Sequence, residues 1–505
     1  MSEAPAGLPV LADLPGARAQ LRGLTEDLRA GLNSIWLLPD RLVANGQAEE
    51  LYLRALSGAR PHIDVPSTLP ADAELLLSAR QTESRPARVA GYGADADQLP
   101  YLDQYDDGFD LGWETDGYVP VIPAPRAEST RAAVPQDDLT LRVAKELSVQ
   151  VDDVIPWLVA PGSDGPPPVI GIRAWAEPDG GPVRGAAVER LYRSLSAAVK
   201  AAGLPPGERP RLLVAARLRD LPAGLPDALH LDSAATTVHW WWGALGRLDV
   251  STAVASCLAA ARTAGRDGDS LGDRVLRQLT AETVIEVCGP DLELARRLAL
   301  DWDGRQRTLD AALRRCLAAG TPVTGGSPEA PTRMGARHRP GVDVREAWSG
   351  GAIAAWEGRL RTHPGTWYPV GPVAELTGDA RARLAALIAQ AQQRVVLPWI
   401  EEARQRLAAR SLHHLNRPVE SVVEDYIERP ALHLRTRPER AFLEIQVGEL
   451  LHAHRQGAVA LPGHEAQLLR LLVKVRNILS HRSVLHDATV REFGDELSRS
   501  DLRTP

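Results

Sequence analysis

The sequence predicts an α/β N-terminal domain, with a parallel sheet and helices on both faces, followed by an all-α C-terminal helical bundle. Apolar runs alternate with helical patterns in the first half, and such alternation favours a parallel sheet that is buried on both faces. About four helical patterns fill the last part of the chain, which suits an up-and-down bundle. A stretch rich in Gly, Pro, Ser and Thr at 320–346 lies between these parts and is typical of a linker.

Each expected element follows from a local pattern. Strands are expected where apolar runs are bounded by proline or charged residues, and helices where apolar residues recur every three or four positions. In order, we expect a helix at 17–31, strand 34–39, helix 41–57, strand 168–175, helix 183–202, strand 210–217, helices 272–287, 290–303 and 308–319, a long helix from 378 to 410 with Pro398 as a break or kink, and helices at 438–457, 463–481 and 487–498.

These patterns divide the chain into four parts. The α/β domain is expected at 1–235, with a loop or insertion at 80–136 where Gly, Pro and Asp are dense and periodicity is missing. A helical, lid-like subdomain follows at 236–320. The linker then occupies 321–346, and the helical bundle occupies 347–505.

Composition narrows the classes of function. The chain has 505 residues, a net charge of −7 and an ordinary content of apolar residues. The net charge argues against a general nucleic-acid coat, although residues 376–505 carry 19 basic against 16 acidic residues. We see no export signal and no apolar run long enough for a membrane span. The three widely spaced cysteines suggest reduced thiols, so we expect a cytoplasmic protein without membrane contact.

Residues 467–481, QLLRLLVKVRNILSH, are the most distinctive stretch of the chain. Apolar residues recur there at helical spacing and form one stripe. Arg476, Asn477 and His481 supply a fixed cation, an amide and a group that titrates near neutral pH. Asn477 and His481 share a helix face, whereas Arg476 lies about 140° round the helix from His481. Arg476 and His481 therefore meet only if the helix ends or bends between them.

This stretch resembles the signature of the HEPN superfamily, in which an Arg and a polar residue precede a His after a short spacer, here RNILSH at 476–481. The resemblance implies a small bundle whose motif helix faces a second copy, so that a homodimer forms one metal-independent RNase site. It implies that His481 is the acid or base on the 2′-hydroxyl and the leaving oxygen, that Arg476 holds the scissile phosphate and that Asn477 orients it. Neither a metal nor a cofactor is expected there.

The chemistry suits these three residue types. In-line transfer to a 2′-hydroxyl needs proton transfer near pH 7 and a donor for developing negative charge. The alternative leaves Arg476 as a solvated helix residue and His481 as a capping group near the C-terminal dipole. The preceding helix carries Glu444 and Glu449, which are candidates to pair with Arg476 or to raise the pKa of His481. Ordinary surface charge is the alternative for both acids.

A nucleotide-binding layout is expected in the first half, but its characteristic loop is missing. Strand then helix at 34–57 is where a glycine-rich loop and a lysine would hold phosphates. None of Lys145, Lys200 and Lys474 follows a glycine, so GxxxxGK[ST] is absent. The pattern of 17–320, with PRLLVAARLRDLPAGLPD and EVCGPDLELARRLALDWDG, nonetheless resembles a STAND- or AAA-type ATPase. This resemblance implies a degenerate P-loop domain without ATP hydrolysis; an unrelated α/β domain is the alternative.

Trp240, Trp241 and Trp242 form the most unusual local sequence. Three adjacent indoles cannot all face one core, because neighbours point about 100° apart in a helix and about 180° apart in a strand. We therefore expect at least one to be partly exposed or to lie between domains. Stacking on a base or binding a partner is the functional interpretation. Packing between the sheet and the helical lid is the alternative that we favour.

Two short motifs occur in unsuitable contexts. Residues 103–114 place acids at calcium-loop positions, but Tyr105 replaces a ligand and Pro100 disrupts the entering helix, which favours a solvated acidic loop. Residues 268–272 spell GxSxG, but no buried strand precedes them, so Ser270 is predicted to cap a helix.

Together these features favour a bacterial conflict or anti-phage defence component: a HEPN-type RNA-cleaving or RNA-binding effector that an ATPase-like domain regulates. Its expected partners are RNA, a second copy of the chain and a second protein subunit. The alternative is a non-catalytic scaffold that holds partner proteins in a defence complex. A third interpretation is a nucleotide sensor that binds through backbone amides alone.

Overall fold

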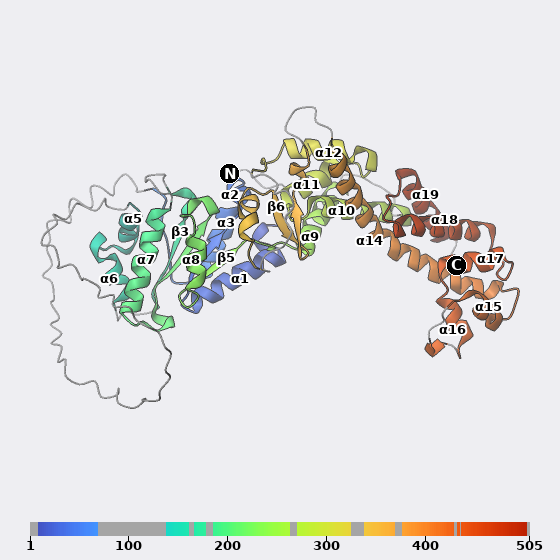
Figure 1. Cartoon of the computed structure of the whole chain (residues 1–505), viewed down its shortest axis with the longest axis horizontal. Coiled ribbons are helices and arrows are strands. Elements are labelled where there is room, and N and C mark those ends of the chain that lie inside the picture. The colour runs from blue at the N-terminus through green and yellow to red at the C-terminus, as the bar shows by residue number, and fades with distance from the viewer. Residues whose placement is uncertain are drawn as a thin grey trace, which may run out of the picture.

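The computed structural model describes residues 9–68, 138–160, 166–177, 185–262, 270–324, 338–368, 376–428, 432–434 and 436–501. The chain is elongated, with an α/β part at one end, a helical part at the other and a β-hairpin with four helices between them (Figure 1). The whole of the predicted insertion at 80–136, including the calcium-like loop, lies outside the described residues.

Five parallel strands form the sheet of the α/β part, in the order β2-β3-β4-β1-β5. The first strand thus lies inside the sheet, where Ile35 pairs with Val214 on one side and with Val238 on the other. The predicted strands at 34–39, 168–175 and 210–217 are confirmed, and β2 and β5 are additional. The strands are β1 (Asn33–Leu37), β2 (His62–Asp64), β3 (Val169–Arg173), β4 (Arg211–Ala216) and β5 (Thr236–Trp240).

Helices cover both faces of this sheet, as predicted. A Cβ added at Gly171 of β3 would lie 2.3 Å from the hydroxyl of Tyr52, so α3 packs on that face. The hydroxyls of Tyr192 in α7 and Thr236 in β5 lie 2.5 Å apart on the opposite face, since register neighbours share a face and successive residues alternate. The helices are α1 (Pro15–Arg29), α2 (Asp40–Ala44), α3 (Gln47–Ser57), α5 (Asp138–Leu147), α6 (Val154–Val159), α7 (Ala186–Ala201) and α8 (Leu225–Leu231).

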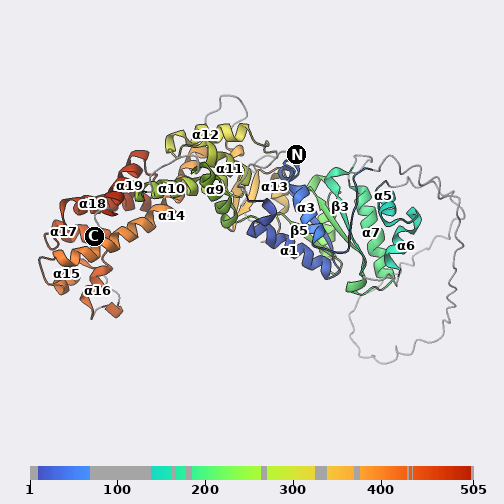
Figure 2. The ribbon, with the colours of Figure 1, turned by 180° about the vertical axis from the view of Figure 1, so that it is seen from behind.

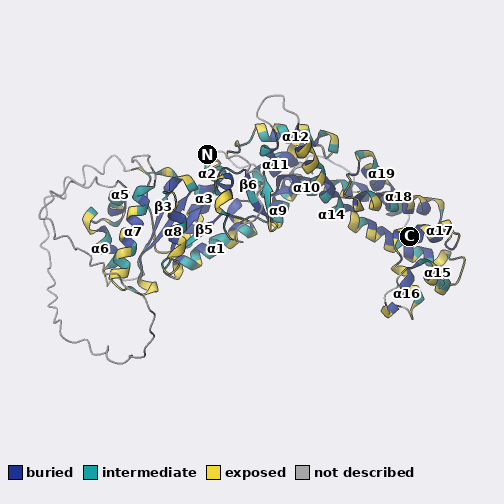
Figure 3. Ribbon diagram, viewed as in Figure 1, coloured by how far each residue is buried: buried dark blue, intermediate teal, exposed yellow. Residues whose placement is uncertain are grey.

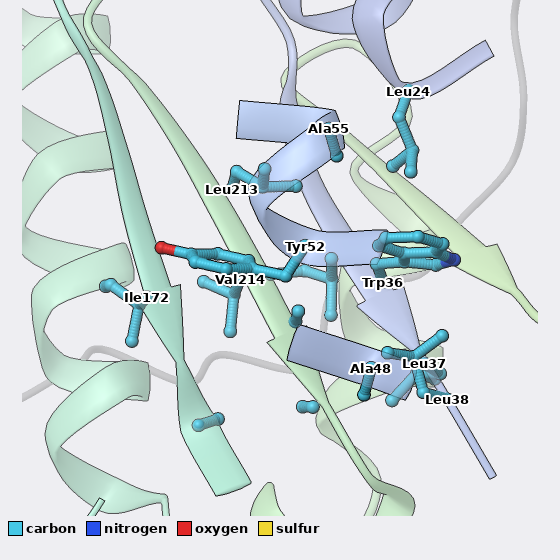
Figure 4. Packing of buried hydrophobic residues seen from close by; sticks show 14 of the residues in the cluster. Leu24, Trp36, Leu37, Leu38, Ala48, Tyr52, Ala55, Ile172, Leu213 and Val214 are labelled. Carbon is cyan, nitrogen blue, oxygen red and sulfur yellow. The ribbon is translucent and has the colours of Figure 1, made fainter. Parts of the chain in front are cut away.

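The first core is built around β1, all five residues of which are buried. Trp36 of this strand is fully buried, and its indole N–H donates to the side chain of Gln20 in α1 at 3.1 Å. Figure 4 shows Trp36 in one cluster with Leu24 of α1, Tyr52 of α3 and Leu213 of β4. Burial of continuous apolar strands between two helical layers is the main stabilising term of such a sheet.

Four helices follow β5: α9 (Arg247–Arg262), α10 (Leu271–Cys288), α11 (Leu292–Asp301) and α12 (Gln306–Ala318). The predicted role of Ser270 is confirmed, because its side chain accepts the Asp273 N–H at 3.2 Å and caps α10. The second half of α10 packs with α9, α11 and α12 in a separate core, whereas its first half packs with α14 and α19. This helix therefore links the middle of the chain to the C-terminal helices.

A hairpin not predicted from the sequence lies between the sheet and the C-terminal helices. The hairpin is formed by β6 (Ile353–Trp356) and β7 (Arg359–Thr362), and the short helix α13 (Arg345–Ser349) precedes it. Glu357 and Gly358 both have positive φ, as a two-residue hairpin turn requires. Buried residues from Val344 to Ala355 belong to the core of the sheet. This arrangement differs from the predicted boundary at 347, since the start of the predicted bundle packs on the first domain.

The C-terminal part is helical, as predicted. Its longest helix, α14, runs without interruption through Pro398 and packs against both α10 and α18. Figure 2 shows α18 beside α14, and α19 packs against α10 and α18. In Figure 3 buried and exposed residues alternate along these helices. The helices are α14 (Gly378–Ser411), α15 (Val419–Tyr426), α16 (Pro438–Leu443), α17 (Val447–Arg455), α18 (Gly463–Ser480) and α19 (Asp487–Asp501).

The helix predicted over 438–457 is two helices, because the chain turns between α16 and α17. The guanidinium of Arg404, on α14, donates to the carbonyls of Leu443 at 2.7 Å and Ile445 at 3.0 Å. These bonds satisfy carbonyls that a continuous helix would have paired internally. Propensity within 438–457 did not reveal the turn, since the donor lies about forty positions earlier in the chain.

Candidate functional site

The predicted catalytic residues lie at the C-terminal end of α18. Arg476 and Asn477 occupy its last turns, and His481 is the residue that ends it. Arg482 adopts a positive φ of 55°, and the N–H of Ser483 donates to the carbonyl of Ile478 at 3.1 Å. This backbone pattern closes many helices at their C-terminus. The helix therefore ends at His481 and not between Arg476 and His481, so the condition under which the two residues would meet in one chain is not fulfilled.

All three side chains are exposed, and none makes a hydrogen bond or an ion pair with another described residue. Arg470, Lys474, Asn477 and His481 are spaced by four, three and four residues, so they form one stripe on the outer face of α18. Lys474 is 3.7 Å from Glu492 of α19. The stripe is therefore polar, accessible and weakly basic, as a surface for a phosphate backbone would be.

One chain does not bring Arg476 and His481 to the same point. Because α18 continues to Ser480, the two residues keep a separation of about 140° around the helix axis and about 7.5 Å along it. A phosphate held by the guanidinium of Arg476 in one copy would thus need an imidazole from elsewhere.

The two acids predicted to support the site have other surroundings. The carboxylate of Glu449 accepts the backbone N–H groups of Gln446 at 2.8 Å and Glu428 at 3.2 Å, which caps α17. Glu444 is exposed in the turn between α16 and α17. Neither acid forms an ion pair with Arg476 or His481 within the described part of the chain.

The tryptophan cluster is buried, so the expectation of a partly exposed indole is not met. The exposed fractions of Trp240, Trp241 and Trp242 are 4%, 7% and 3%. Trp240 packs edge-on against Trp348 of α13, with ring centres 5.2 Å apart, and Trp241 lies 6.0 Å from Trp36. All three can be buried because β5 ends at Trp240 and the chain then turns. The cluster thus lies between the sheet and α13, and not between the sheet and the helical lid as in the favoured alternative.

The turn after β1 occupies the place of the missing phosphate loop. It runs through Leu38 and Pro39 into α2, a helix of only five residues. Asp40 begins that helix and lies 3.4 Å from Arg219, so an anion already occupies the helix start. A phosphate there would meet the carboxylate of Asp40 and no lysine.

The other arginines at this edge of the sheet are paired with carboxylates. Arg173, at the end of β3, contacts Asp64 at 3.0 Å and Glu49 at 2.6 Å. Arg217, after β4, contacts Asp220 at 2.8 Å. These internal pairs reduce the positive field that a polyphosphate would require.

A buried charge cluster at the same edge was not predicted from the sequence. Nη2 of Arg41, in α2, lies 2.7 Å from Oδ2 of Asp291, and Nε2 of His363 lies 2.7 Å from the same oxygen. Burial alone would raise the pKa of Asp291, but the hydrogen bond from His363 and the charge of Arg41 outweigh it and hold the pKa well below its usual range. The only local signal was Asp291 as a helix cap after Gly289 and Pro290.

The contacts of His363 determine which ring nitrogen carries the proton. Its Nδ1 accepts the backbone N–H of Gly365 at 3.0 Å, so in the neutral ring Nε2 carries the hydrogen and donates to Asp291. Neither nitrogen is then free to accept a proton from a substrate. The cluster holds structural parts together and does not form a catalytic base.

Comparisons of the chain with family models, curated proteins and solved structures gave no match. Within the described residues, no cluster of His, Cys, Asp and Glu has the geometry of a metal site, and no helix has the length and hydropathy needed to cross a membrane. Cys257, Cys288 and Cys316 are buried free thiols.

Proposed function

We propose that this chain is a metal-independent, HEPN-type ribonuclease of a bacterial anti-phage defence system, acting in the cytoplasm as a homodimer through its C-terminal bundle. The observation that carries the proposal is the exposed group of Arg476, Asn477 and His481 at the end of α18, with no internal partner among the described residues. Buried or paired side chains of these types would indicate a structural role. Their exposure leaves them available to an RNA phosphate.

The proposed reaction uses each side chain in a different way. His481 removes the proton from a 2′-hydroxyl or returns one to the leaving 5′-oxygen. Arg476 donates hydrogen bonds to the phosphate oxygens, where negative charge develops. Asn477 orients the same phosphate. No metal is needed, because a fixed cation and a titrating imidazole supply both the charge stabilisation and the proton transfer.

A homodimer follows from the separation of Arg476 and His481 around α18. An antiparallel pair of such helices would place Arg476 of one copy near His481 of the other. The slightly basic C-terminal part, with 19 basic and 16 acidic residues after 375, suits this role better than the acidic remainder.

We further propose that the α/β part is an ATPase-like regulatory body that does not hydrolyse ATP. The strand order, with β1 between β4 and β5, is similar to that of P-loop ATPases of the STAND and AAA type. The proline and Asp40 after β1, and the paired arginines at the same edge, support the loss of phosphate binding. The contacts of α10 with both α14 and α19 offer a route from this half of the chain to the bundle.

The scaffold alternative remains a second candidate, because the Arg41–Asp291–His363 cluster and the buried hairpin give the chain a rigid centre. Its expected docking surface, Trp240–Trp242, is however buried. A second protein subunit would therefore have to bind elsewhere.

The test is cleavage of total RNA by the purified full chain in EDTA. Arg476→Ala and His481→Ala are expected to lower the rate by about a hundredfold or more without lowering the melting temperature. His464→Ala, at the other end of the same helix, and Arg491→Ala, on α19, are matched exposed controls and should cleave normally. Cleavage that persists in His481→Ala, or that needs Mg²⁺, would contradict the mechanism.

A mixing experiment tests the shared site. Refolding Arg476→Ala chains with His481→Ala chains yields mixed dimers, in which one of the two half-sites keeps both wild-type groups. Activity should return in the mixture if Arg476 and His481 act across the interface. No recovery, although mixed dimers form, would mean that each chain acts alone or that the chain is a scaffold.

A further inference from the structure

A cavity of about 110 Å³ opens at the carboxyl ends of β1 and β5. Its walls come from the turn after β1, the turn after β5, the start of α11 and the β6–β7 hairpin. One water needs about 10–15 Å³ by such a measure, so the space exceeds the needs of a single structural water several times.

The walls are mostly apolar. Leu42 comes from the segment after β1, Trp241 and Leu245 from the segment after β5, and Trp348 and Ile353 from α13 and the hairpin. A mainly apolar cavity with a few converging polar groups is typical of a small-molecule site. The apolar body of a ligand would be buried here.

One cation of this cavity lacks an acidic partner. The guanidinium of Arg361, on β7, donates to the backbone carbonyls of Glu286 and Val287, the latter at 3.3 Å. It forms no ion pair with a carboxylate among the described residues, and its Nε–H has no acceptor. Burial lowers the pKa of Arg361, which reflects the cost of holding this charge away from water. Buried charges are usually paired, so an anion here would be stabilising.

The other charged groups limit that anion to a single charge. Arg41 and His363 are both committed to Asp291. Glu293, a further acid of the lining, is paired with Arg296 at 2.8 Å. A polyphosphate would therefore meet two carboxylates and, among the described residues of the lining, only one cation without a carboxylate at ion-pair distance, Arg361, on which Glu286 and Glu357 act from further away.

We propose that this cavity binds a small organic monoanion, whose carboxylate pairs with Arg361 and whose aromatic or branched apolar body packs against Trp241 and Trp348. The ligand contacts the sheet, α11 and the hairpin together, so it stabilises the assembly of these parts. This proposal goes beyond the ribonuclease and does not depend on RNA cleavage.

Indole-3-acetate is a suitable probe, with the uncharged indole-3-acetamide as its matched control and MgATP as the polyanion. Titration of the full chain, followed by calorimetry and by the shift in melting temperature, is expected to show binding of the acetate about tenfold or more tighter than the amide. Arg361→Gln should abolish this preference. Arg359→Gln, an exposed position of the same strand outside the lining, should retain it.

A filling variant tests the cavity without changing charge. Ala354→Phe places a ring at a partly exposed lining position and should weaken the binding of both indole compounds at least tenfold. This variant tests the cavity even if Arg361→Gln does not fold. The proposal is overturned if neither indole binds, if both bind the wild type equally, if MgATP binds more tightly, or if Ala354→Phe binds like the wild type.

Discussion

Nε2 of His363 and Oδ2 of Asp291 lie 2.7 Å apart in the interior of the protein, although 72 positions separate the two residues in the chain. Arg41 contacts the same oxygen from the segment after β1. One carboxylate thus joins the sheet, the middle helices and the hairpin. Removing one partner of a buried charge cluster leaves the others uncompensated, which commonly costs about 3–5 kcal/mol.

Asp291→Asn is expected to lower stability near neutral pH and to flatten the dependence of stability on pH. The folded-state pKa of Asp291 is depressed, so its contribution is complete above the unfolded-state pKa of about 3.9 and is lost as pH falls below it toward the folded-state value. Urea unfolding at pH 6, above the unfolded-state pKa of Asp291, and at pH 3, below it, measures how much stability each protein loses between the two. The wild type should lose about 1 kcal/mol more than the variant over this range. Equal losses of stability in the wild type and in Asp291→Asn would contradict a stabilising role of the ionised Asp291 carboxylate.

Trp348→Ala is expected to destabilise the first domain by about 3–5 kcal/mol. Its indole is buried against Trp240, and its N–H donates to the carbonyl of Trp241 at 3.2 Å. Trp157→Ala removes a half-exposed indole and should cost less than about 1 kcal/mol. Chemical denaturation followed by fluorescence compares the two variants. Similar small effects would mean that the cluster does not hold the hairpin on the sheet.

Gly272→Ala is expected to destabilise the contact between α10 and α19 by about 1–3 kcal/mol. A Cβ at Gly272 would lie 2.7 Å from the carbonyl oxygen of Gly494, which belongs to the backbone and cannot swing aside. Gly448→Ala is the control, because a Cβ there meets no atom within 4 Å, and it should be neutral or stabilising by about 0.5 kcal/mol. Melting temperatures of both variants are the measurement. An unchanged value for Gly272→Ala would show that the helices separate at low cost.

Arg404→Met is expected to cost about 2–4 kcal/mol, because it leaves the carbonyls of Leu443 and Ile445, in the turn between α16 and α17, without the donor that the buried Arg404 supplies. Arg406→Met, two positions further along α14 and so about 200° round the helix from Arg404, removes a surface pair with Glu402 and should cost under about 1 kcal/mol. Hydrogen exchange in α16 and α17 would locate the effect. Equal protection in both variants would argue against this role of Arg404.

Local patterns predicted much of the architecture because apolar runs and helical periodicity act over a few residues. The strands β1, β3 and β4 and the motif helix α18 were found in this way. The hairpin was missed because Ile353–Trp356 carries no distinctive alternation and gains its stability from the core of the sheet. Strand β5 was missed because its sequence was interpreted as an aromatic cluster.

The class of fold, the absence of a phosphate-loop signature and the positions of Arg476, Asn477 and His481 could be inferred from residue type and short spacing alone. The exposure of these three side chains, the burial of Trp240–Trp242 and the meeting of Arg41, Asp291 and His363 became visible only in the folded chain. Burial and charge pairing depend on which distant segments pack together. That packing is set by the whole core and not by any one stretch of the chain.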